Sequence, residues 1–306
     1  MAGLQNYRIA GLQKVVVVLM AAACASAQSP APSFDSSRAW EHLRQLVAIG
    51  PRPAGSPAIE QARAYIKTQL ASSGLTAVEQ AWDDRTPLGR MRMVNLAVTI
   101  PGARKDRLVI AGHYDTKLFR QFRFVGANDG GSSAAFLIEI ARVLKARRNA
   151  LTIEVLFLDG EEAVNTEWAG TDNTYGSRHY VEVAKRDGSL ASLKAFLLVD
   201  MIGDRDLRIR RDLNSTRWLT DIVWDAAKRQ KLDNYFISET TQVEDDHVPF
   251  LQAGVPSLDI IDLDFAAWHT AQDTLDLVSA RSLQVVGDVL LAALPQIETR
   301  LTAPAR

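Results

Sequence analysis

Cysteine is nearly absent from the chain, and this limits how the fold can be held together. Only one of the 306 residues is a cysteine, Cys24, and it lies close to the N-terminus. A single thiol cannot form an internal disulfide, so stability has to come from a buried core. With 47% hydrophobic residues, the chain is long and apolar enough to bury a large one.

An excess of charge of one sign is absent as well. The chain has 35 lysine and arginine residues against 36 aspartate and glutamate residues, a net charge of -1, and no long basic run. Nucleic acids and anionic membranes attract proteins through concentrated positive charge. The sequence therefore indicates neither a nucleic-acid partner nor a membrane-surface partner.

The apolar run at residues 15–23 is too short to span a bilayer as a helix, so no membrane span is expected. Arg8 and Lys14 precede this run, and Ala25-Ser26-Ala27 follows it, which is the pattern of a signal peptide with its cleavage site. We expect residues 1–27 to be a signal peptide, residues 28–36 a linker that contains proline and serine, and residues 37–303 a single folded domain.

Cleavage after Ala27 would also remove the single cysteine. An exported protein without disulfides suits a bacterial periplasmic or secreted enzyme. The alternative is lipidation of Cys24, which would anchor the protein to a membrane. The leucine that usually stands upstream of such a cysteine is replaced by Ala21, so the sequence favours cleavage over the lipid anchor.

Apolar periodicity predicts strands that alternate with helices. A first helix capped by Ser37 and ended by Gly50, and a second that starts at Ser56-Pro57, come before the strands. The expected strands are 94–100, 108–111, 153–158, 196–199 and 256–261, and the clearest later helices are 132–144, 215–228 and 280–297. This pattern favours an α/β domain with a central mixed, mostly parallel twisted sheet flanked by helices on both faces.

Acidic and histidine residues follow the expected strands, at the places where such sheets form their sites. These residues are His113 and Asp115, Asp159 with Glu161 and Glu162, Asp200, His269, and Asp129 in a glycine-rich turn that opens a helix. Taken singly, an acid in such a position often only caps a helix. Together they offer the imidazole and carboxylate ligands of a zinc site. Because neighbouring glutamates cannot both ligate one metal in the same geometry, one of Glu161 and Glu162 could ligate while the other acts as general acid/base.

The order His-x-Asp, Asp in a glycine-rich turn, Glu-Glu, Asp and a late His resembles the zinc aminopeptidase superfamily. Within that superfamily, the local sequences are most similar to animal-type glutaminyl-peptide cyclotransferases. Seven stretches between about Trp40 and Leu277 carry this resemblance, in the family's order: 52–57, 112–117, 125–129, 157–163, 168–179, 244–250 and 268–270. The fold that the resemblance implies is the zinc aminopeptidase-like α/β fold.

The resemblance implies a zinc-dependent enzyme that converts the N-terminal glutamine of peptides and proteins to pyroglutamate and releases ammonia. One zinc ion is expected, and a second is not excluded. The roles implied are zinc ligands for Asp129, Glu162 and His269, general acid/base for Glu161, a catalytic polar network for Asp200 and Asp245, and a glutamine pocket for Trp168 and Trp268. His113, Asp115 and His247 would hold a second metal or support the ligands, and His247, inside Glu-Asp-Asp-His, could support Asp245. The enzyme is expected to be a monomer.

The main rival is a two-zinc aminopeptidase, because His113 and Asp200 are the residues that a second zinc would require. Three stretches resemble cyclotransferases and favour that reading: Asp245-Asp246-His247, Trp268-His269 and the tract from Trp168 to His179. A catalytically inactive scaffold is disfavoured because the glutamate pair and the other expected ligands are intact. Against the animal sequences, the chain departs at Gly112 and Ala134, where a cysteine pair is common, and at Asp259, where a histidine is common. The other tryptophans, Trp40, Trp82, Trp218 and Trp224, are expected to be packing anchors.

Overall fold

The computed structural model describes residues 33–165 and 167–303. The expected signal peptide, Cys24 and most of the expected linker lie outside the described residues. Within the described part of the chain, no helix is both long and apolar enough to cross a membrane.

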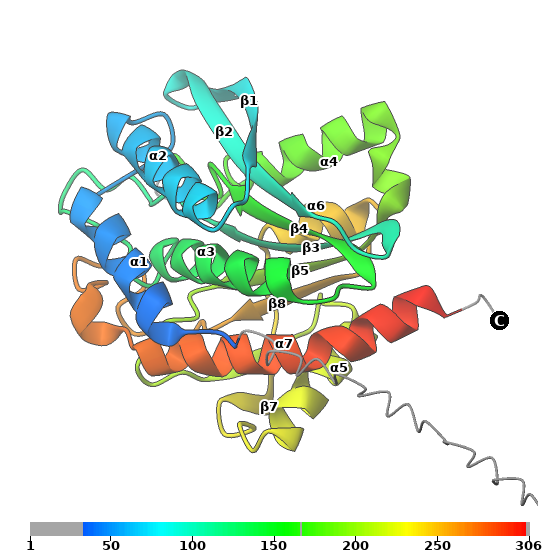
Figure 1. Cartoon of the computed structure of the whole chain (residues 1–306). Coiled ribbons are helices and arrows are strands. Elements are labelled where there is room, and N and C mark those ends of the chain that lie inside the picture. The colour runs from blue at the N-terminus through cyan, green and yellow to red at the C-terminus, as the bar shows by residue number, and fades with distance from the viewer. Residues whose placement is uncertain (1–32, 166, 304–306) are drawn as a thin grey trace, which may run out of the picture. The chain divides into compact units, whose positions relative to one another are not determined.

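A six-stranded mixed sheet forms the centre of the fold (Figure 1). Its strand order is β1 (Ala77–Thr86), β2 (Gly89–Ile100), β4 (Leu151–Leu158), β3 (Arg104–His113), β5 (Leu193–Asp200) and β8 (Ser257–Ile261). Strands β4, β3, β5 and β8 run parallel, and β1 and β2 are antiparallel additions at one edge. The predicted mixed, mostly parallel sheet is confirmed, and each expected strand lies in one of these elements.

Three strands were not expected from the sequence. Strand β1 pairs with β2 along its whole length, but apart from the buried Trp82 its residues are exposed or only partly buried, so it has no apolar alternation to reveal it. Strands β6 (Ile209–Asp212) and β7 (Phe236–Thr241) form a separate two-stranded parallel sheet. Both are short, and β7 is largely polar and exposed.

The helices are α1 (Ser36–Ile49), α2 (Pro57–Ser72), α3 (Gly131–Ala146), α4 (Tyr175–Asp187), α5 (Arg217–Arg229), α6 (His247–Gln252) and α7 (Ala280–Thr302). Ser56 caps α2 as predicted, through a hydrogen bond from the backbone N–H of Ile59. The cap of α1 differs from the prediction. Asp35, not Ser37, is the N-cap, because its carboxylate accepts hydrogen bonds from the backbone N–H groups of Ser37 and Arg38.

Helices cover both faces of the sheet, as the near-continuous apolar strands predicted. Along β3, Leu108 and Ile110 point into a large core shared with α1, α3 and α7, whereas Val109 and Ala111 point into a second core. That second core is closed by α4 and by α6, which contributes Phe250. Figure 1 shows α1, α3 and α7 on one side of the sheet, with α4 and α6 on the other.

The parallel strands decide where the polar residues gather. Strands β3, β4, β5 and β8 all end at the same edge of the sheet, and the chain leaves that edge through loops. His113 is the last residue of β3, and Asp200 is the last residue of β5. The glutamate pair follows β4 after two residues. A site at this edge is therefore a consequence of the strand order.

Candidate functional site

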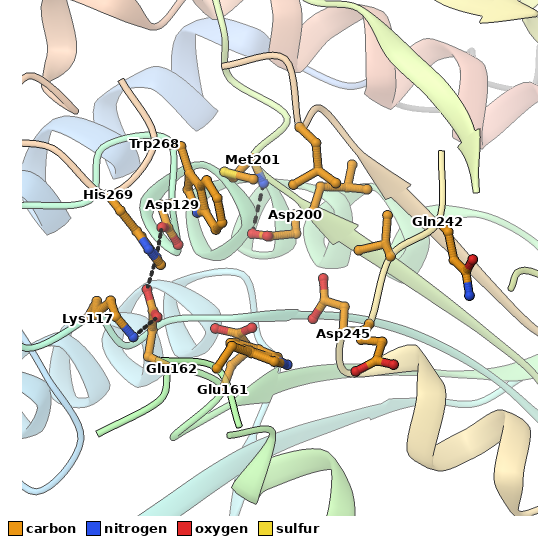
Figure 2. A pocket seen from close by; sticks show the side chains of 15 residues that line it. Lys117, Asp129, Glu161, Glu162, Asp200, Met201, Gln242, Asp245, Trp268 and His269 are labelled. Atoms are coloured by element: carbon orange, nitrogen blue, oxygen red, sulfur yellow. Dashed lines mark hydrogen bonds and ion pairs between the residues drawn. The ribbon is translucent and has the colours of Figure 1, made fainter. Parts of the chain in front are cut away.

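A cavity of about 340 Å³ opens at this edge of the sheet (Figure 2). Its wall contains every residue that the sequence assigned to catalysis, to the first metal or to the glutamine pocket: Asp129, Glu161, Glu162, Trp168, Asp200, Asp245, Trp268 and His269. Asp200 ends strand β5 and the others stand in loops, and together they span positions 129 to 269 of the chain. The structure therefore brings together what the sequence order only implied.

One group of three potential metal ligands lies on one side of the cavity. The Nε2 atom of His269 lies 3.4 Å from Oδ2 of Asp129 and 3.5 Å from Oε1 of Glu162, and dashed lines mark both pairs in Figure 2. One ligand atom from each residue falls within 4.8 Å of the others. Asp129 Oδ2 and both carboxylate oxygens of Glu162 are buried without a hydrogen-bond donor. Buried acceptors without donors are costly, and a cation would satisfy them, so this donor set fits zinc.

A second group of three shares Asp129 with the first. The Nε2 atom of His113 lies 3.0 Å from Oδ1 of Asp200 and 3.2 Å from Oδ1 of Asp129. In this group, too, one ligand atom from each residue lies within 4.8 Å of the others, so the three could hold a metal ion. The residues that the two-zinc rival requires are thus brought together as well.

The charges of the first group are strongly coupled. Burial by itself would lower the pKa of His269, but its close contacts with the carboxylates of Asp129 and Glu162 outweigh burial and raise that pKa to about 9. Burial, followed by the charge of Asp129, raises the pKa of Glu162. The pKa of Asp129 is lowered, since the two histidines His113 and His269 outweigh the effect of its burial. The positive charge of the His269 imidazolium thus offsets part of the negative charge of the two carboxylates.

Glu161 belongs to neither group of three. Burial raises its pKa well above the usual range; nearby His113 opposes the shift, and the charges of Glu162 and Asp245 add to it. A carboxyl group with a raised pKa can both hold and release a proton near neutral pH, which is what a general acid/base requires. The carboxylate of Asp245 also has a raised pKa, through burial and the nearby charge of Asp200.

Asp115 fixes the backbone of the two glutamates. Its carboxylate accepts hydrogen bonds from the backbone N–H groups of Glu161 and Glu162, both at 3.3 Å. The same carboxylate lies 3.4 Å from Nδ1 of His113. Asp115 is therefore placed to orient three neighbouring side chains rather than to meet a substrate.

His247 is fully buried and lies between two other acids. Its Nε2 atom is 3.2 Å from Asp212, and its Nδ1 atom is 3.7 Å from Asp259. The contact with Asp245 considered from the sequence is not among its ion-pair distances within the described residues. Asp259 is thus a neighbour of this histidine.

A glycine and the carboxylate of Asp273 shape the turn that carries Asp129. Gly130, at φ 74°, is the N-cap of α3, so the alternative in which Asp129 only caps the helix is wrong. A side chain on Gly130 would collide with the backbone oxygen of Asp115. Asp273 fixes the turn from the other side by accepting the backbone N–H groups of Asn128 and Asp129. The Asp129 carboxylate is left free to face the two histidines.

The tryptophans fall into two sets by position. Trp168 is 37% exposed and Trp268 is 46% exposed, and both line the cavity. The ring of Trp268 stacks on His269, with centroids 4.3 Å apart. By contrast, Trp82 and Trp224 are buried, and Trp40 and Trp218 pack against the main core.

Several residues around the site were not given a role from the sequence. Lys117 is buried, donates a hydrogen bond to the backbone oxygen of Ala163 and lies 3.6 Å from Glu162. Phe119 and Phe124 pack edge-on against His269. Lys117 ends the matched stretch 112–117, which could have indicated its importance. Nothing in the local sequence of the two phenylalanines points to the histidine, because that contact exists only after folding.

Comparisons with known proteins agree with the geometry. Residues 95–294 match the model of peptidase family M28. A glutaminyl-peptide cyclotransferase-like protein of Bos taurus is 32% identical, over 79% of this chain and 70% of its own. The crystal structure of an Acidobacteriales bacterium glutaminyl cyclase is similar with a TM-score of 0.84 and 42% identity, covering 90% of this chain and 99% of that one. A Bacteroides thetaiotaomicron structure described as a leucine aminopeptidase precursor has a TM-score of 0.79 and 25% identity, covering 86% and 98%.

Proposed function

Since the chain belongs to peptidase family M28, and its relatives there are glutaminyl-peptide cyclotransferases, we propose that it converts the N-terminal glutamine of peptides and proteins to pyroglutamate with release of ammonia. The observation that carries the proposal is the division of the adjacent glutamates. Glu162 lies with Asp129 and His269 in a group that fits zinc, whereas Glu161 lies outside that group and lines the same cavity.

Asp129, Glu162 and His269 would hold one zinc ion. When bound, zinc would polarise the side-chain carbonyl of the substrate glutamine and stabilise the negative charge that develops on its oxygen. The remaining chemistry falls to the protein's own side chains.

Ring closure needs the transfer of protons. The α-amine of the glutamine attacks its own γ-amide carbon, so the amine must lose a proton and the departing ammonia must gain one. Glu161 lies in the cavity wall with a raised pKa, and this suits it to accept the first proton and deliver the second. Asp245, whose pKa is also raised, and Asp200 would complete the polar network around it.

Orientation accounts for the rest. The nucleophile is already tethered to the carbonyl, and holding the two in a near-attack geometry can supply on the order of 7 kcal/mol of the barrier or more. Trp168 and Trp268 stand at the mouth of the cavity, where they would clamp the substrate and keep out water. Water must be excluded because its attack would give glutamate instead of pyroglutamate.

The remaining predictions from the sequence stand as part of this proposal. The signal peptide at residues 1–27, export by a bacterial cell and a monomeric enzyme follow from the sequence argument above. N-terminal sequencing of the exported protein would test the cleavage after Ala27, and light scattering would test the monomer.

A two-zinc aminopeptidase is the second candidate, and one observation favours it. His113, Asp129 and Asp200 form a second potential metal group that shares Asp129 with the first. An aminopeptidase would cleave the peptide bond after the first residue, whereas a cyclotransferase leaves that bond intact.

The discriminating experiment offers purified, zinc-loaded protein a glutaminyl peptide and a leucyl peptide of otherwise identical sequence. From the first we expect ammonia and an intact peptide that is lighter by one ammonia in the mass spectrum, and we expect no reaction with the second. Free leucine from the second peptide would identify an aminopeptidase and overturn the proposal.

A further inference from the structure

A second cavity, of about 330 Å³, opens beside the catalytic cavity. The two share Trp168, Glu244 and Asp245 in their walls. Another neighbour, which shares Glu162 with the catalytic cavity, has only about 20 Å³ and is too small for a side chain. A peptide whose N-terminal glutamine fills the catalytic cavity must continue outward, and the second cavity provides space of the right size next to it.

The wall of the second cavity suits an extended peptide. The chain before α4 contributes Thr171 and Asn173, and α6 contributes Val248, Pro249 and Gln252. Hydroxyl and amide groups can satisfy the backbone of a bound peptide, and the apolar residues offer contact area to a side chain. The second cavity therefore has the mixed lining that a peptide subsite requires.

Charge in this region is concentrated at the shared wall. Glu244 is exposed and makes no hydrogen bond or ion pair with the described residues. Arg178 lines only the second cavity, and its guanidinium is engaged by the backbone oxygens of Thr171 and Asn173 and by the ring of Tyr175. A side chain directly after the glutamine would thus meet the Glu244 carboxylate first, and Arg178 only farther along.

We propose that the second cavity binds the residue that follows the N-terminal glutamine, and that Glu244 gives the enzyme a preference for lysine or arginine at that position. This inference rests on the proposed function, because it takes the glutamine to occupy the catalytic cavity. Opposite charges at a partly exposed wall attract weakly, so the preference is a matter of several-fold and not of orders of magnitude.

The test compares the peptides Gln-Lys-Ala-amide, Gln-Ala-Ala-amide and Gln-Glu-Ala-amide, whose blocked C-termini remove a competing carboxylate. The kcat/KM for ammonia release by zinc-loaded enzyme is measured for each. We expect the lysine peptide to exceed the glutamate peptide by about fivefold at low salt, and the ratio to shrink as ionic strength rises. Glu244→Gln should bring the ratio close to one, and Glu244→Lys should reverse it.

Glu182→Gln is the matched control. Glu182 is also an exposed glutamate, on α4, and it lines neither cavity. Its loss changes the net charge by the same amount, so it should leave the lysine-to-glutamate ratio at the wild-type value. Thermal unfolding of each variant shows that the fold is intact.

The outcomes separate this inference from the function on which it rests. If no peptide releases ammonia, the proposed function fails. If all three are cyclised at the same kcat/KM, the function stands and the charge preference is refuted. A wild-type preference for lysine that survives Glu244→Gln would likewise refute the role given to Glu244.

Discussion

Glu161 and Glu162 are neighbours in sequence but occupy different chemical environments. Asp115 accepts the backbone N–H groups of both residues, and this fixes the two side chains relative to each other. Glu162 is directed to His269, and Glu161 stays outside the metal group. We therefore propose that Glu162 binds the metal and that Glu161 transfers protons.

Glu161→Gln should separate these two roles. The amide keeps the shape of the side chain but cannot shuttle a proton, so we expect kcat to fall by about 10² to 10⁴-fold while bound zinc stays at the wild-type level. Glu162→Gln is the control, and it should lose zinc as well as activity. Steady-state kinetics and metal analysis provide the two readouts. A Glu161→Gln enzyme with wild-type kcat would refute the acid/base assignment.

Zinc binding should release protons. The pKa of His269 is raised to about 9 without the ion, and that of Glu162 is also raised, so at pH 7 the imidazole carries a proton that zinc must displace. Affinity for zinc should then rise with pH until about pH 9. Calorimetric titrations at pH 7 in buffers of different ionisation enthalpy would measure the release. A binding enthalpy that does not depend on the buffer would contradict this expectation.

The sequence predicted the residues of the cavity better than it predicted what supports them. Asp129, Glu162 and His269 stand in short stretches whose order could be recognised. Lys117 and Phe124, by contrast, acquire their importance from neighbours far away in the chain. Contacts of that kind depend on how the loops fold back, and periodicity and local motifs do not encode them.

Among the larger elements, the segment that carries Trp168 depends on a single acid. The carboxylate of Asp172 accepts hydrogen bonds from the backbone N–H groups of Val164 and Asn165 and from the hydroxyl of Tyr175. These bonds close the loop on itself and join it to the start of α4. The position of Trp168 over the cavity is thus set by Asp172, which does not itself line the catalytic cavity.

Removing this support should weaken substrate binding more than it slows the chemistry. For Asp172→Ala we expect KM to rise about tenfold, which corresponds to on the order of 1.4 kcal/mol, with a smaller change in kcat. Asp172→Asn keeps one acceptor oxygen and should show a smaller rise. Kinetics with a glutaminyl peptide would measure both constants. A fall in kcat at unchanged KM would contradict a purely positional role.

The elements that the sequence missed share a physical reason. In strand β1 only Trp82 is buried, α6 is only six residues long, and α4 has a strongly polar exposed side. Long buried strands were found because continuous apolar runs identify them directly. At Gly112, β3 approaches α3 so closely that a side chain would collide with Ser133. Close packing is therefore what joins strand and helix at this point.

The fold as a whole is held by its core and by a few buried polar residues, as expected for a chain with one cysteine. Arg52 is the largest of these. Its fully buried guanidinium donates to the backbone oxygens of Tyr114, Val125 and Gly126, and so ties the start of the loop between β3 and α3 to a later part of the same loop. His113, at the end of β3, and Asp129, just before α3, are close in sequence to these contacts.

Arg52→Met should therefore destabilise the protein strongly. It leaves three backbone oxygens without their donor, and we expect a loss of about 3 kcal/mol or more in the free energy of unfolding. Arg44→Met is the control, because Arg44 is exposed and its ion pair with the equally exposed Glu41 contributes little to stability. Urea unfolding of the three proteins measures the difference. Equal stability of both variants would show that Arg52 has no such role.

We propose that one zinc ion, held by Asp129, Glu162 and His269, is required for closing the glutamine ring. The most direct measurement is ammonia release from a glutaminyl peptide before chelation, after chelation and dialysis, and after adding back one equivalent of zinc. We expect ammonia release to be lost when the metal is removed and to be restored in full by that single equivalent of zinc. Unchanged ammonia release by the metal-free protein would contradict it.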